Sequence, residues 1–408
     1  MRRRRLATIG GAGAGVVAVL LGAGVGLQLS RPVPRPRVQQ TLPRTYTVPG
    51  HPTGLPWPRV GQAAIYLDGF GWLGSTAPEP AVPIASVTKV MTALVVLRDH
   101  PLQVGESGPS VTVSVADAQL YRSEGAAGDS VVPVVAGESL TELQLLEGLL
   151  VPSGDNLAVL LADWVSGSES AFVTRMNRLA DSLGLAQTHF TDSSGLDPAS
   201  VSSARNLVTL ARFAMRSPVF AAVVAMPGVD LPVVGGVRNY NRLLGSDGVV
   251  GVKTGWTSSA GGCLLVVQRR WLLGRRRELV AAVLGQPGGS LSALVGAAGA
   301  ASSLLSAGGS ELRRVRLPAR GNAVGVVRPA WAAGIPVKVE SPLELVAPAG
   351  SRLGVQLRLG AVRPPLRRGA RVGTLWLRRT LGTRVRARAI LARRLPAPSL
   401  WWRLTARL

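Results

Sequence analysis

The order in which strand-like and helix-like runs follow one another is the feature that most constrains the fold of this chain. A strand-like run, QAAIYLDG, begins at Gln62, and three more follow from Val249 in VVGVKTG, GCLLVVQ and ELVAAVLG. Between them the sequence has helical texture, in residues 86–94, 139–151, 156–165, 170–183 and 204–216. A helical middle enclosed by strands predicts a sheet that is closed by distant segments and flanked by helices, an α/β (α+β) fold. Ser139 and Glu142 are expected to form a capping box at the start of one helix.

A second domain is predicted after about residue 312. Short strand-like runs broken by Gly and Pro, RLPARGNAVGVVRP, GIPVKVESP and RRGARVGTLWL, indicate a small all-β domain over residues 313–392. The chain has 408 residues, 47% of them apolar, which is ample for two cores. The main domain is expected over residues 59–312, and the proline-rich residues 31–58 are expected to form an extended linker.

The chain begins with MRRRR, and the run from Leu6 to Leu29 that follows carries no charge. Such a run is long enough to span a bilayer, and with its basic start it is typical of an export signal. It exceeds a usual signal-peptide core and no clear A-x-A site follows, so residues 1–30 are interpreted as an uncleaved signal-anchor rather than a cleaved signal peptide. The arginines keep the N-terminus inside, which places the body outside the cytoplasm.

The last residues, 393–408, form an amphipathic tail. As a helix, SLWWRLTARL places Leu400, Leu404 and Leu408 on one stripe, with Arg403 and Arg407 one turn apart. Tryptophan and arginine on a short apolar helix favour a helix lying in the membrane interface. The alternative is a tail that packs on the β domain. We expect the membrane, because the N-terminal run already implies one.

Charge is distributed unevenly along the chain. Residues 1–45 carry a net charge of +8, residues 46–312 carry −3 and residues 313–408 carry +19. Basic ends suit a polyanion, such as nucleic acid, an anionic membrane surface or an anionic wall polymer. Export argues against nucleic acid. The plain alternative is arginine enriched through a GC-rich genome.

Cysteine and histidine are too sparse for a metal centre. The chain has one cysteine, Cys263, in an apolar run that indicates a core position, and its histidines are His51, His100 and His189. The histidines are scattered and no carboxylate or cysteine cluster accompanies them, which argues against a zinc site and against a Ser-His-Asp hydrolase. We expect no metal and no cofactor.

Lysine is rare in this chain, and that makes its positions informative. Among 46 basic residues the lysines are Lys89, Lys253 and Lys338. If Ser86 opens a helix, Lys89 lies one turn later on the same face. A lysine whose pKa is lowered can take the serine proton, whereas arginine stays charged. S-x-x-K alone also fits an ordinary solvated helix start.

Two further motifs accompany the pair. Ser153 lies 67 residues after Ser86, in the Gly-containing loop VPSGDN. A hundred residues later comes Lys253-Thr254-Gly255 in strand texture, which alone would fit an exposed strand end. The order and spacing of the three motifs together point to one active site.

The motifs give the chain a resemblance to the serine D-alanyl-D-alanine carboxypeptidases, the low-molecular-mass penicillin-binding proteins of the S11 peptidase type. The resemblance covers about residues 60–390 and rests on PIASVTKVMTAL, GESLTELQLLEGLLVPSGDN, TDSSGLDP, ARNLVTLA and RNYNRLLGSDGVVGVKTGWTSSAGGCL. It implies a penicillin-binding/β-lactamase-like transpeptidase domain, a β-rich second domain and an amphipathic membrane anchor. Peptidoglycan stem peptides ending in D-Ala-D-Ala are then the substrates, and β-lactam antibiotics the inhibitors.

The resemblance also implies roles for the motif residues. Ser86 would be the acylated nucleophile, Lys89 its general base and Ser153 a proton relay to the leaving D-alanine. The implied substrate-binding residues are Lys253, Thr254, Gly255 and Asn156. The implied oxyanion hole consists of the backbone N–H groups of Ser86 and Trp256.

Two departures from the family's pattern leave alternatives open. Where the family usually has Ser-x-Asn, this chain has Asp155, followed by Asn156, and either residue could take the position. No basic residue lies between Glu278 and Leu312 to bind the substrate carboxylate, so Lys253 and Thr254 would do so, or an arginine such as Arg242.

Two other functions remain at this stage. A β-lactamase would need a carboxylate to activate water, with Asp192 and Asp197 as the candidates. A membrane scaffold that binds wall stems without catalysis would be favoured if Asp155 disables the site.

Overall fold

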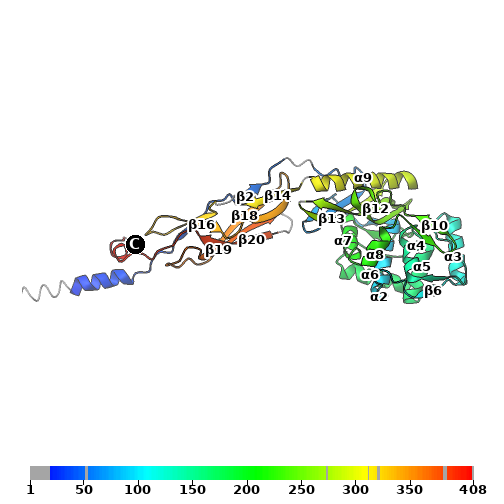
Figure 1. Cartoon of the computed structure of the whole chain (residues 1–408), viewed down its shortest axis with the longest axis horizontal. Coiled ribbons are helices and arrows are strands. Elements are labelled where there is room, and N and C mark those ends of the chain that lie inside the picture. The colour runs from blue at the N-terminus through cyan, green and yellow to red at the C-terminus, as the bar shows by residue number, and fades with distance from the viewer. Residues whose placement is uncertain are drawn as a thin grey trace, which may run out of the picture. The chain divides into compact units, whose positions relative to one another are not determined.

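A computed structural model describes residues 19–50, 54–272, 274–310, 312–318, 322–379 and 384–406. The chain divides into two compact units, one formed by Thr53–Leu312 and the other by Met1–Pro52 together with Arg313–Leu408 (Figure 1). The first unit is called the catalytic unit below, and the second the β unit.

A five-stranded antiparallel sheet organises the catalytic unit, in the order β11-β12-β13-β3-β4. Its strands are β3 (Gln62–Leu67), β4 (Gly71–Ser75), β11 (Val249–Thr257), β12 (Gly261–Leu272) and β13 (Arg275–Gln286). The distant segments meet where β13 pairs with β3, with Leu279 opposite Leu67. This confirms the predicted α/β (α+β) class and the closure of the sheet by segments far apart in the sequence.

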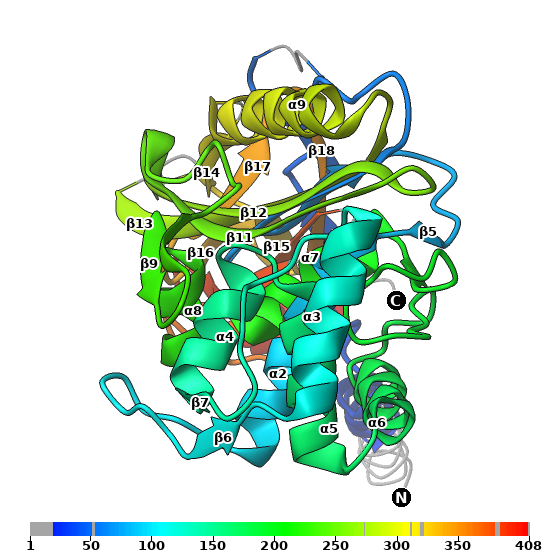
Figure 2. The same cartoon turned by 90° about the vertical axis from the view of Figure 1, so that its right-hand side faces the viewer.

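Helices cover both faces of this sheet, as Figure 2 shows. Helix α9 (Ser290–Ser310) lies on one face and packs on β12 and β13. The helical middle fills the other side, with α7 against β3 and β13. It consists of α2 (Lys89–Asp99), α3 (Val115–Ala127), α4 (Glu142–Leu150), α5 (Asp155–Ser166), α6 (Glu169–Ser182), α7 (Ala204–Ala214) and α8 (Pro218–Val224). Short elements complete the unit: η1 (Ala85–Thr88), η2 (Ser246–Gly248) and the strand pairs β5–β8 (Val82–Pro83, Val201–Ser202), β6–β7 (Ser110–Thr112, Ser139–Thr141) and β9–β10 (Gly228–Leu231, Gly235–Arg238).

Helix α4 begins two residues later than expected. The predicted capping box has Ser139 as the N-cap residue and Glu142 as its partner. Thr141 is the N-cap residue: its hydroxyl accepts from the Gln144 N–H at 3.2 Å, and its own N–H donates to the Gln144 side chain at 2.9 Å. Ser139 instead belongs to β7, which pairs with β6. Strand pairing holds residues up to 141 extended, so the helix starts only after them.

Helix α9 is a core helix despite its composition. Among the described residues it is the single helix with the length and hydropathy to cross a membrane, but one side of it is buried against the sheet, including Ala293, Ala297 and Leu304. The predicted N-terminal signal-anchor lies partly outside the described residues, which include its final part as an apolar helix, Val19–Ser30.

The β unit contains a seven-stranded antiparallel sheet in the order β1-β15-β16-β20-β19-β18-β2 and a separate pair, β14–β17. The strands are β1 (Arg37–Gln40), β2 (Thr45–Thr47), β14 (Leu312–Leu317), β15 (Gly325–Arg328), β16 (Ile335–Val339), β17 (Leu343–Pro348), β18 (Arg352–Leu359), β19 (Arg371–Arg379) and β20 (Arg384–Leu391). Its core is aliphatic, with Val337, Leu353 and Leu375 fully buried.

The segment 31–58 differs from the expected linker, because β1 and β2 form the two edges of that sheet. Val38 and Tyr46, at the middle of the two strands, pack against the core of the β unit. Edge positions tolerate the neighbouring prolines, which lack a ladder donor.

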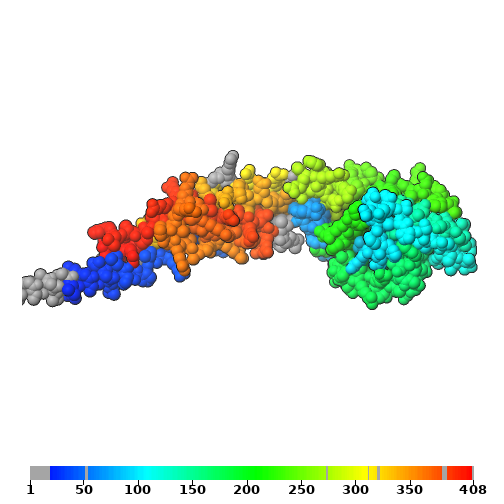
Figure 3. Space-filling model, turned by 60° about the horizontal axis from the view of Figure 1, so that its bottom comes forward, coloured from blue at the N-terminus to red at the C-terminus, as the bar shows by residue number. Residues whose placement is uncertain are grey.

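The C-terminal tail forms a short helix, α10 (Leu400–Thr405), and lies beside the helix Val19–Ser30, as Figures 1 and 3 show. Gln28 Nε2 donates to the Ala406 carbonyl at 3.0 Å, and the Arg403 side chain donates to the Leu29 carbonyl. Trp402 packs on Trp331 with ring centroids 5.6 Å apart, while Trp401 is 76% exposed.

Candidate active site

The first motif lies in a tight turn between β5 and α2. Ser86 is the second residue of η1, and Lys89 is the first residue of α2. The Lys89 side chain is fully buried and donates to Ser86 Oγ at 2.8 Å, to the Ser194 carbonyl at 3.1 Å and to the Asp155 carboxylate. Three acceptors satisfy the three ammonium donors, which is what a buried lysine requires. The structure therefore brings Ser86 and Lys89 together as the sequence predicts.

The second motif enters the site from the loop between α4 and α5. Ser153 is 97% buried and has a φ of +71°, a conformation that costs energy for a residue with a side chain. Asp155, the first residue of α5, accepts from the Ser130 N–H at 3.0 Å through the oxygen not used by Lys89. It is Asp155, not Asn156, that faces the pocket.

Asn156 is a correction to the expected substrate-binding set. Its Oδ1 accepts from the Val132 N–H and its Nδ2 donates to the Val132 carbonyl, both at 2.9 Å. The amide is thus committed to backbone on the side away from the pocket. It fixes the loop before β7 and does not line the cavity.

The third motif is the middle of β11. Lys253 is 98% buried, and its ammonium group donates to the Thr254 carbonyl at 3.0 Å. Burial, together with the positive charge of Lys89, holds the pKa of Lys253 well below its ordinary value. Thr254, Gly255 and Trp256 line the cavity.

Gly255 sits where β11 passes the nucleophile turn. A Cβ added to it would lie 2.9 Å from the Ser86 nitrogen and 3.1 Å from the Ala85 Cβ. Only glycine permits this approach without a shift of the turn, so the motif needs glycine for closeness and not for a special dihedral angle.

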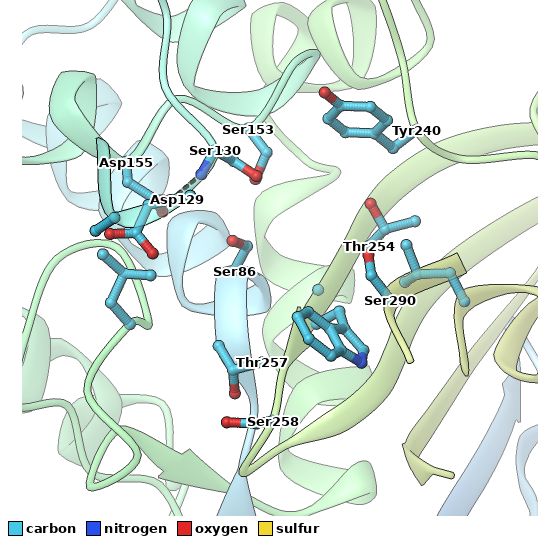
Figure 4. Close-up of a pocket in the computed structure, with 16 residues that line it drawn as sticks. Ser86, Asp129, Ser130, Ser153, Asp155, Tyr240, Thr254, Thr257, Ser258 and Ser290 are labelled. Carbon is cyan, nitrogen blue, oxygen red and sulfur yellow. Dashed lines mark hydrogen bonds between the residues drawn. The ribbon is translucent and has the colours of Figure 1, made fainter. Parts of the chain in front are cut away.

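These elements enclose a cavity of about 620 Å³. Figure 4 shows Ser86 near its centre, Asp129 and Asp155 on one side, and Thr254 and Ser290 on the other. Sequence reasoning assigned no role to several lining residues, which come from loops and from the first turns of α9: Asp129, Ser130, Leu196, Tyr240, Ser290 and Leu294.

The lining carries acidic groups and no arginine or lysine among the described residues. Burial and the charge of Asp155 raise the pKa of Asp129 above its ordinary value. Burial raises the pKa of neighbouring Glu124 to about 7, and the charges of Asp155 and Asp129 add to the rise. Arg242, considered for the substrate carboxylate, is exposed and does not line the cavity.

The two acids considered for a β-lactamase lie elsewhere. Asp192 holds its own loop together by accepting from the Gly195 and Leu196 N–H groups at 2.7 and 2.8 Å. Asp197 accepts from the Ala199 N–H at 2.9 Å. Neither lines the cavity, so the geometry does not favour that alternative.

A family model described as D-alanyl-D-alanine carboxypeptidase, Peptidase S11, matches residues 73–287, which include all three motifs. The chain belongs to this family. As the resemblance implied, the protein is a serine peptidase. It is a hydrolase with the D-alanyl-D-alanine carboxypeptidase activity of this family.

Curated relatives agree. The D-alanyl-D-alanine carboxypeptidase DacB2 of Mycobacterium tuberculosis is 37% identical over 226 residues, covering 54% of this chain and 72% of the relative. The D-alanyl-D-alanine carboxypeptidase of Streptomyces sp. strain K15 is 35% identical over 202 residues, covering 45% and 67%.

Solved structures extend the likeness to the β unit. Penicillin-binding protein 6B from Escherichia coli superposes with a TM-score of 0.60 at 25% identity, over 84% of this chain and 99% of that one. Penicillin-binding protein 5 from Haemophilus influenzae gives a TM-score of 0.60 at 21% identity, over 84% and 100%, and shows the fold alone. The expected transpeptidase-type domain with an added β-rich region is confirmed.

Proposed function

We propose that this carboxypeptidase removes the terminal D-alanine from peptidoglycan stem peptides through an acyl-enzyme on Ser86. The contact that carries the proposal is the 2.8 Å hydrogen bond between Lys89 Nζ and Ser86 Oγ at the cavity. A serine oxygen beside a buried amine is the arrangement that nucleophilic catalysis requires. β-Lactams, which acylate such serines, would act as inhibitors.

Lys89 must be neutral to accept the Ser86 proton. Its ammonium group contacts the Asp155 carboxylate, and both side chains are almost fully buried. Asp155 is the contacting group that could take one proton from Lys89 and so free the amine to act as the base. Asp155 also accepts from the Ser130 N–H, so it fixes Lys89 beside Ser86, which fits catalysis rather than a disabled site.

The chemical steps then follow. Ser86 Oγ attacks the penultimate D-alanine carbonyl carbon while its proton moves to Lys89. The negative charge on the carbonyl oxygen is stabilised by the N–H groups of Ser86 and Trp256. The C–N bond breaks as the leaving amine takes a proton relayed by Ser153, and water afterwards hydrolyses the ester on Ser86.

The terminal carboxylate of the substrate would bind on the β11 side of the cavity. Lys253, the residue before Thr254 in β11, is buried and does not itself line the cavity. Burial and the charge of Lys89 lower its pKa, and a carboxylate bound beside Thr254 would supply the opposite charge that favours its protonated form. The Thr254 hydroxyl adds a donor next to it. No arginine assists them within the described lining.

The test is acylation of the full chain by benzylpenicillin, followed by intact mass and a peptide map. We expect a long-lived adduct on Ser86. Ser86→Ala should form no adduct and release no D-alanine from a D-Ala-D-Ala peptide. Lys89→Arg should also form no adduct. Arginine keeps the positive charge and the hydrogen-bond donors of Lys89 but cannot accept the Ser86 proton. Release of D-alanine by Ser86→Ala would refute the proposal, and a stem peptide bound without any acylation would favour the scaffold.

The site of action would be the outer face of the cytoplasmic membrane. The charge-free run after four arginines favours export, and α10 beside the helix Val19–Ser30 offers a membrane-facing surface. New wall is assembled next to that surface, which is where a carboxypeptidase meets its substrate.

A further inference from the structure

The seven-stranded sheet of the β unit presents a strongly basic face to solvent. In β20 the sequence RVRARA alternates, with Ala387 and Ala389 facing the core and Arg384, Arg386 and Arg388 exposed. Every outward position in this run is arginine. Period-two alternation of this kind assigns the three arginines to one face.

The neighbouring strands extend the same face. Cross-strand pairing sets Arg378 opposite Arg384, Trp376 opposite Arg386, and Thr374 opposite both Arg388 and Arg358. On the other side of β20, Lys338 of β16 pairs with Ile390 and is exposed. The basic face is therefore defined by Arg358, Arg378, Arg384, Arg386, Arg388 and Lys338, with Trp376 among them.

The like-charged pairs of this face lower the stability of the sheet when no anion is bound to it. Like charges directly opposite each other destabilise a strand pair, and Arg378 faces Arg384. Arg37 of β1 likewise faces Arg328 of β15 at the edge of the sheet. Gln356, exposed on the same face, shows that a charged residue is not required at an outward position of these strands. Among the described residues near this face Glu340 is the partner acid, 3.8 Å from Arg388 and itself 57% exposed.

The spacing of the charges suits a linear polyanion. Alternate residues of a strand are about 6.6 Å apart and neighbouring strands about 4.8 Å apart. The arginines thus form rows with a repeat similar to that of phosphates along an extended phosphodiester chain. The Trp376 ring lies 5.6 Å from the Arg384 guanidinium and 5.5 Å from that of Arg386, which fixes both groups beside a flat apolar surface.

We propose that the basic face binds a linear cell-wall polymer with phosphate in its repeating unit, separately from the catalytic cavity. A membrane surface fits less well, because the large, strongly exposed apolar side chains of the described β unit lie on α10 and on the helix Val19–Ser30, and not on these strands. Binding would hold the enzyme within anionic wall material while Ser86 acts on peptides.

The experiment measures binding of the full chain, in detergent micelles, to fluorescent poly(glycerol phosphate) over a range of salt concentrations. The test variant is Arg384→Gln/Arg386→Gln/Arg388→Gln. The matched control, Arg59→Gln/Arg122→Gln/Arg178→Gln, removes the same charge from exposed positions of the catalytic unit. A circular dichroism spectrum and thermal unfolding of each protein report whether the β unit is folded. Benzylpenicillin acylation reports the catalytic unit and keeps this test separate from that of the proposed function.

We expect the test variant to lose about tenfold or more in affinity and about two units of salt slope, since fewer phosphate counterions are released. The control variant should stay within about twofold of the parent. Equal losses in both variants would reduce the effect to net charge and overturn the proposal. The proposal would also be overturned if the parent protein did not bind the polymer. If the test variant lost binding only to phosphatidylglycerol vesicles, the lipid surface would be the partner instead.

Discussion

At the residue scale, the order Asp155-Asn156 is explained by what each side chain must satisfy. The Val132 backbone offers both an N–H and a carbonyl, and of the two side chains the Asn156 amide can accept from one and donate to the other, whereas a carboxylate can only accept. Lys89 and the Ser130 N–H are both donors, and a carboxylate accepts from both. The exchanged order would set an acceptor-only group against the Val132 carbonyl. The departure from Ser-x-Asn is therefore a consistent local solution and not a lost motif.

Ser290 is the position where a change should improve carboxylate binding. It begins α9 and lines the cavity beside Thr254, on a lining without arginine or lysine among the described residues. An arginine there could form charge-assisted hydrogen bonds with the terminal carboxylate of the substrate. We expect Ser290→Arg to raise kcat/KM on a D-Ala-D-Ala peptide about tenfold, the equivalent of about 1.4 kcal/mol.

The control for this change is Ser303→Arg, on an exposed part of the same helix that does not line the cavity. A peptide with a C-terminal carboxamide should bind the Ser290→Arg enzyme no better than the parent. An equal gain with the carboxamide would show that the arginine acts other than through the carboxylate.

At the element scale, the start of α4 carries an unusual acid. Glu142 is 0% exposed and neither carboxylate oxygen has a hydrogen-bond partner. Burial raises its pKa from 4.5 to about 7. The folded protein therefore holds this proton up to about pH 7, while the unfolded chain loses it near pH 4.5. Ionisation of Glu142 lowers the free energy of unfolding as pH rises through this window.

Glu142→Gln should remove that penalty. We expect the variant to exceed the parent in stability by about 3 kcal/mol at pH 8, from a shift of about 2.5 pKa units at 1.36 kcal/mol each. The difference should shrink towards pH 4.5, where both chains are uncharged at this position. Chemical denaturation at several pH values measures it, with Glu106→Gln in a neighbouring exposed loop as the control. A constant difference across pH would contradict this account.

Elements with a strong local pattern could be predicted from the sequence, and elements fixed by pairing could not. The sheet and helices of the catalytic unit follow from period and length. β1 and β2 span four and three residues between prolines and show no period; they become strands only because the sheet of the β unit offers two edges. The two-residue error at the start of α4 has the same cause, since pairing with β6 holds Thr141 extended.

The residues of the active site divide in the same way, into those that local sequence spacing reveals and those that only the fold brings together. Ser86 and Lys89 are joined by a spacing of one turn, which a sequence displays. Asp129 and Ser290 reach the cavity through a loop after α3 and a helix start after β13, and only the folded sheet brings them near Ser86. Asn156 was misplaced because a choice between adjacent polar residues depends on which backbone groups face them.

At the scale of the whole molecule, the cavity lies in the catalytic unit, and the excess of positive charge lies in the β unit. Every residue that lines the cavity lies between Ser86 and Leu294, within the catalytic unit. The β unit contains residues 313–408, with a net charge of +19, and the N-terminal segment that supplies β1 and β2. Catalysis and attachment are thereby separated along the chain, and the first 52 residues belong with the last 96.

Membrane attachment should depend on both ends of the chain. In the helix Val19–Ser30, Leu20, Leu21 and Leu27 are exposed, and in α10 Leu400 and Trp401 are exposed. The two elements contact each other through Gln28 and Arg403, so their apolar side chains gather in one region of the β unit. Exposed apolar patches of this kind mark a membrane or protein contact, and a Trp-bearing helix favours the membrane interface. We expect the full chain to sediment with membranes after expression.

Truncation separates the two contributions. Removal of residues 1–30 keeps β1 at Arg37, and a cut after Pro396 keeps the carbonyl that accepts from Trp331 Nε1 at 2.8 Å. The chain without residues 1–30 should bind vesicles weakly and reversibly through α10, because one short apolar helix gives limited affinity. The chain without either end should remain in the supernatant and still be acylated by benzylpenicillin. Sedimentation of that doubly truncated, acylated protein with zwitterionic vesicles would show that attachment comes from elsewhere in the chain.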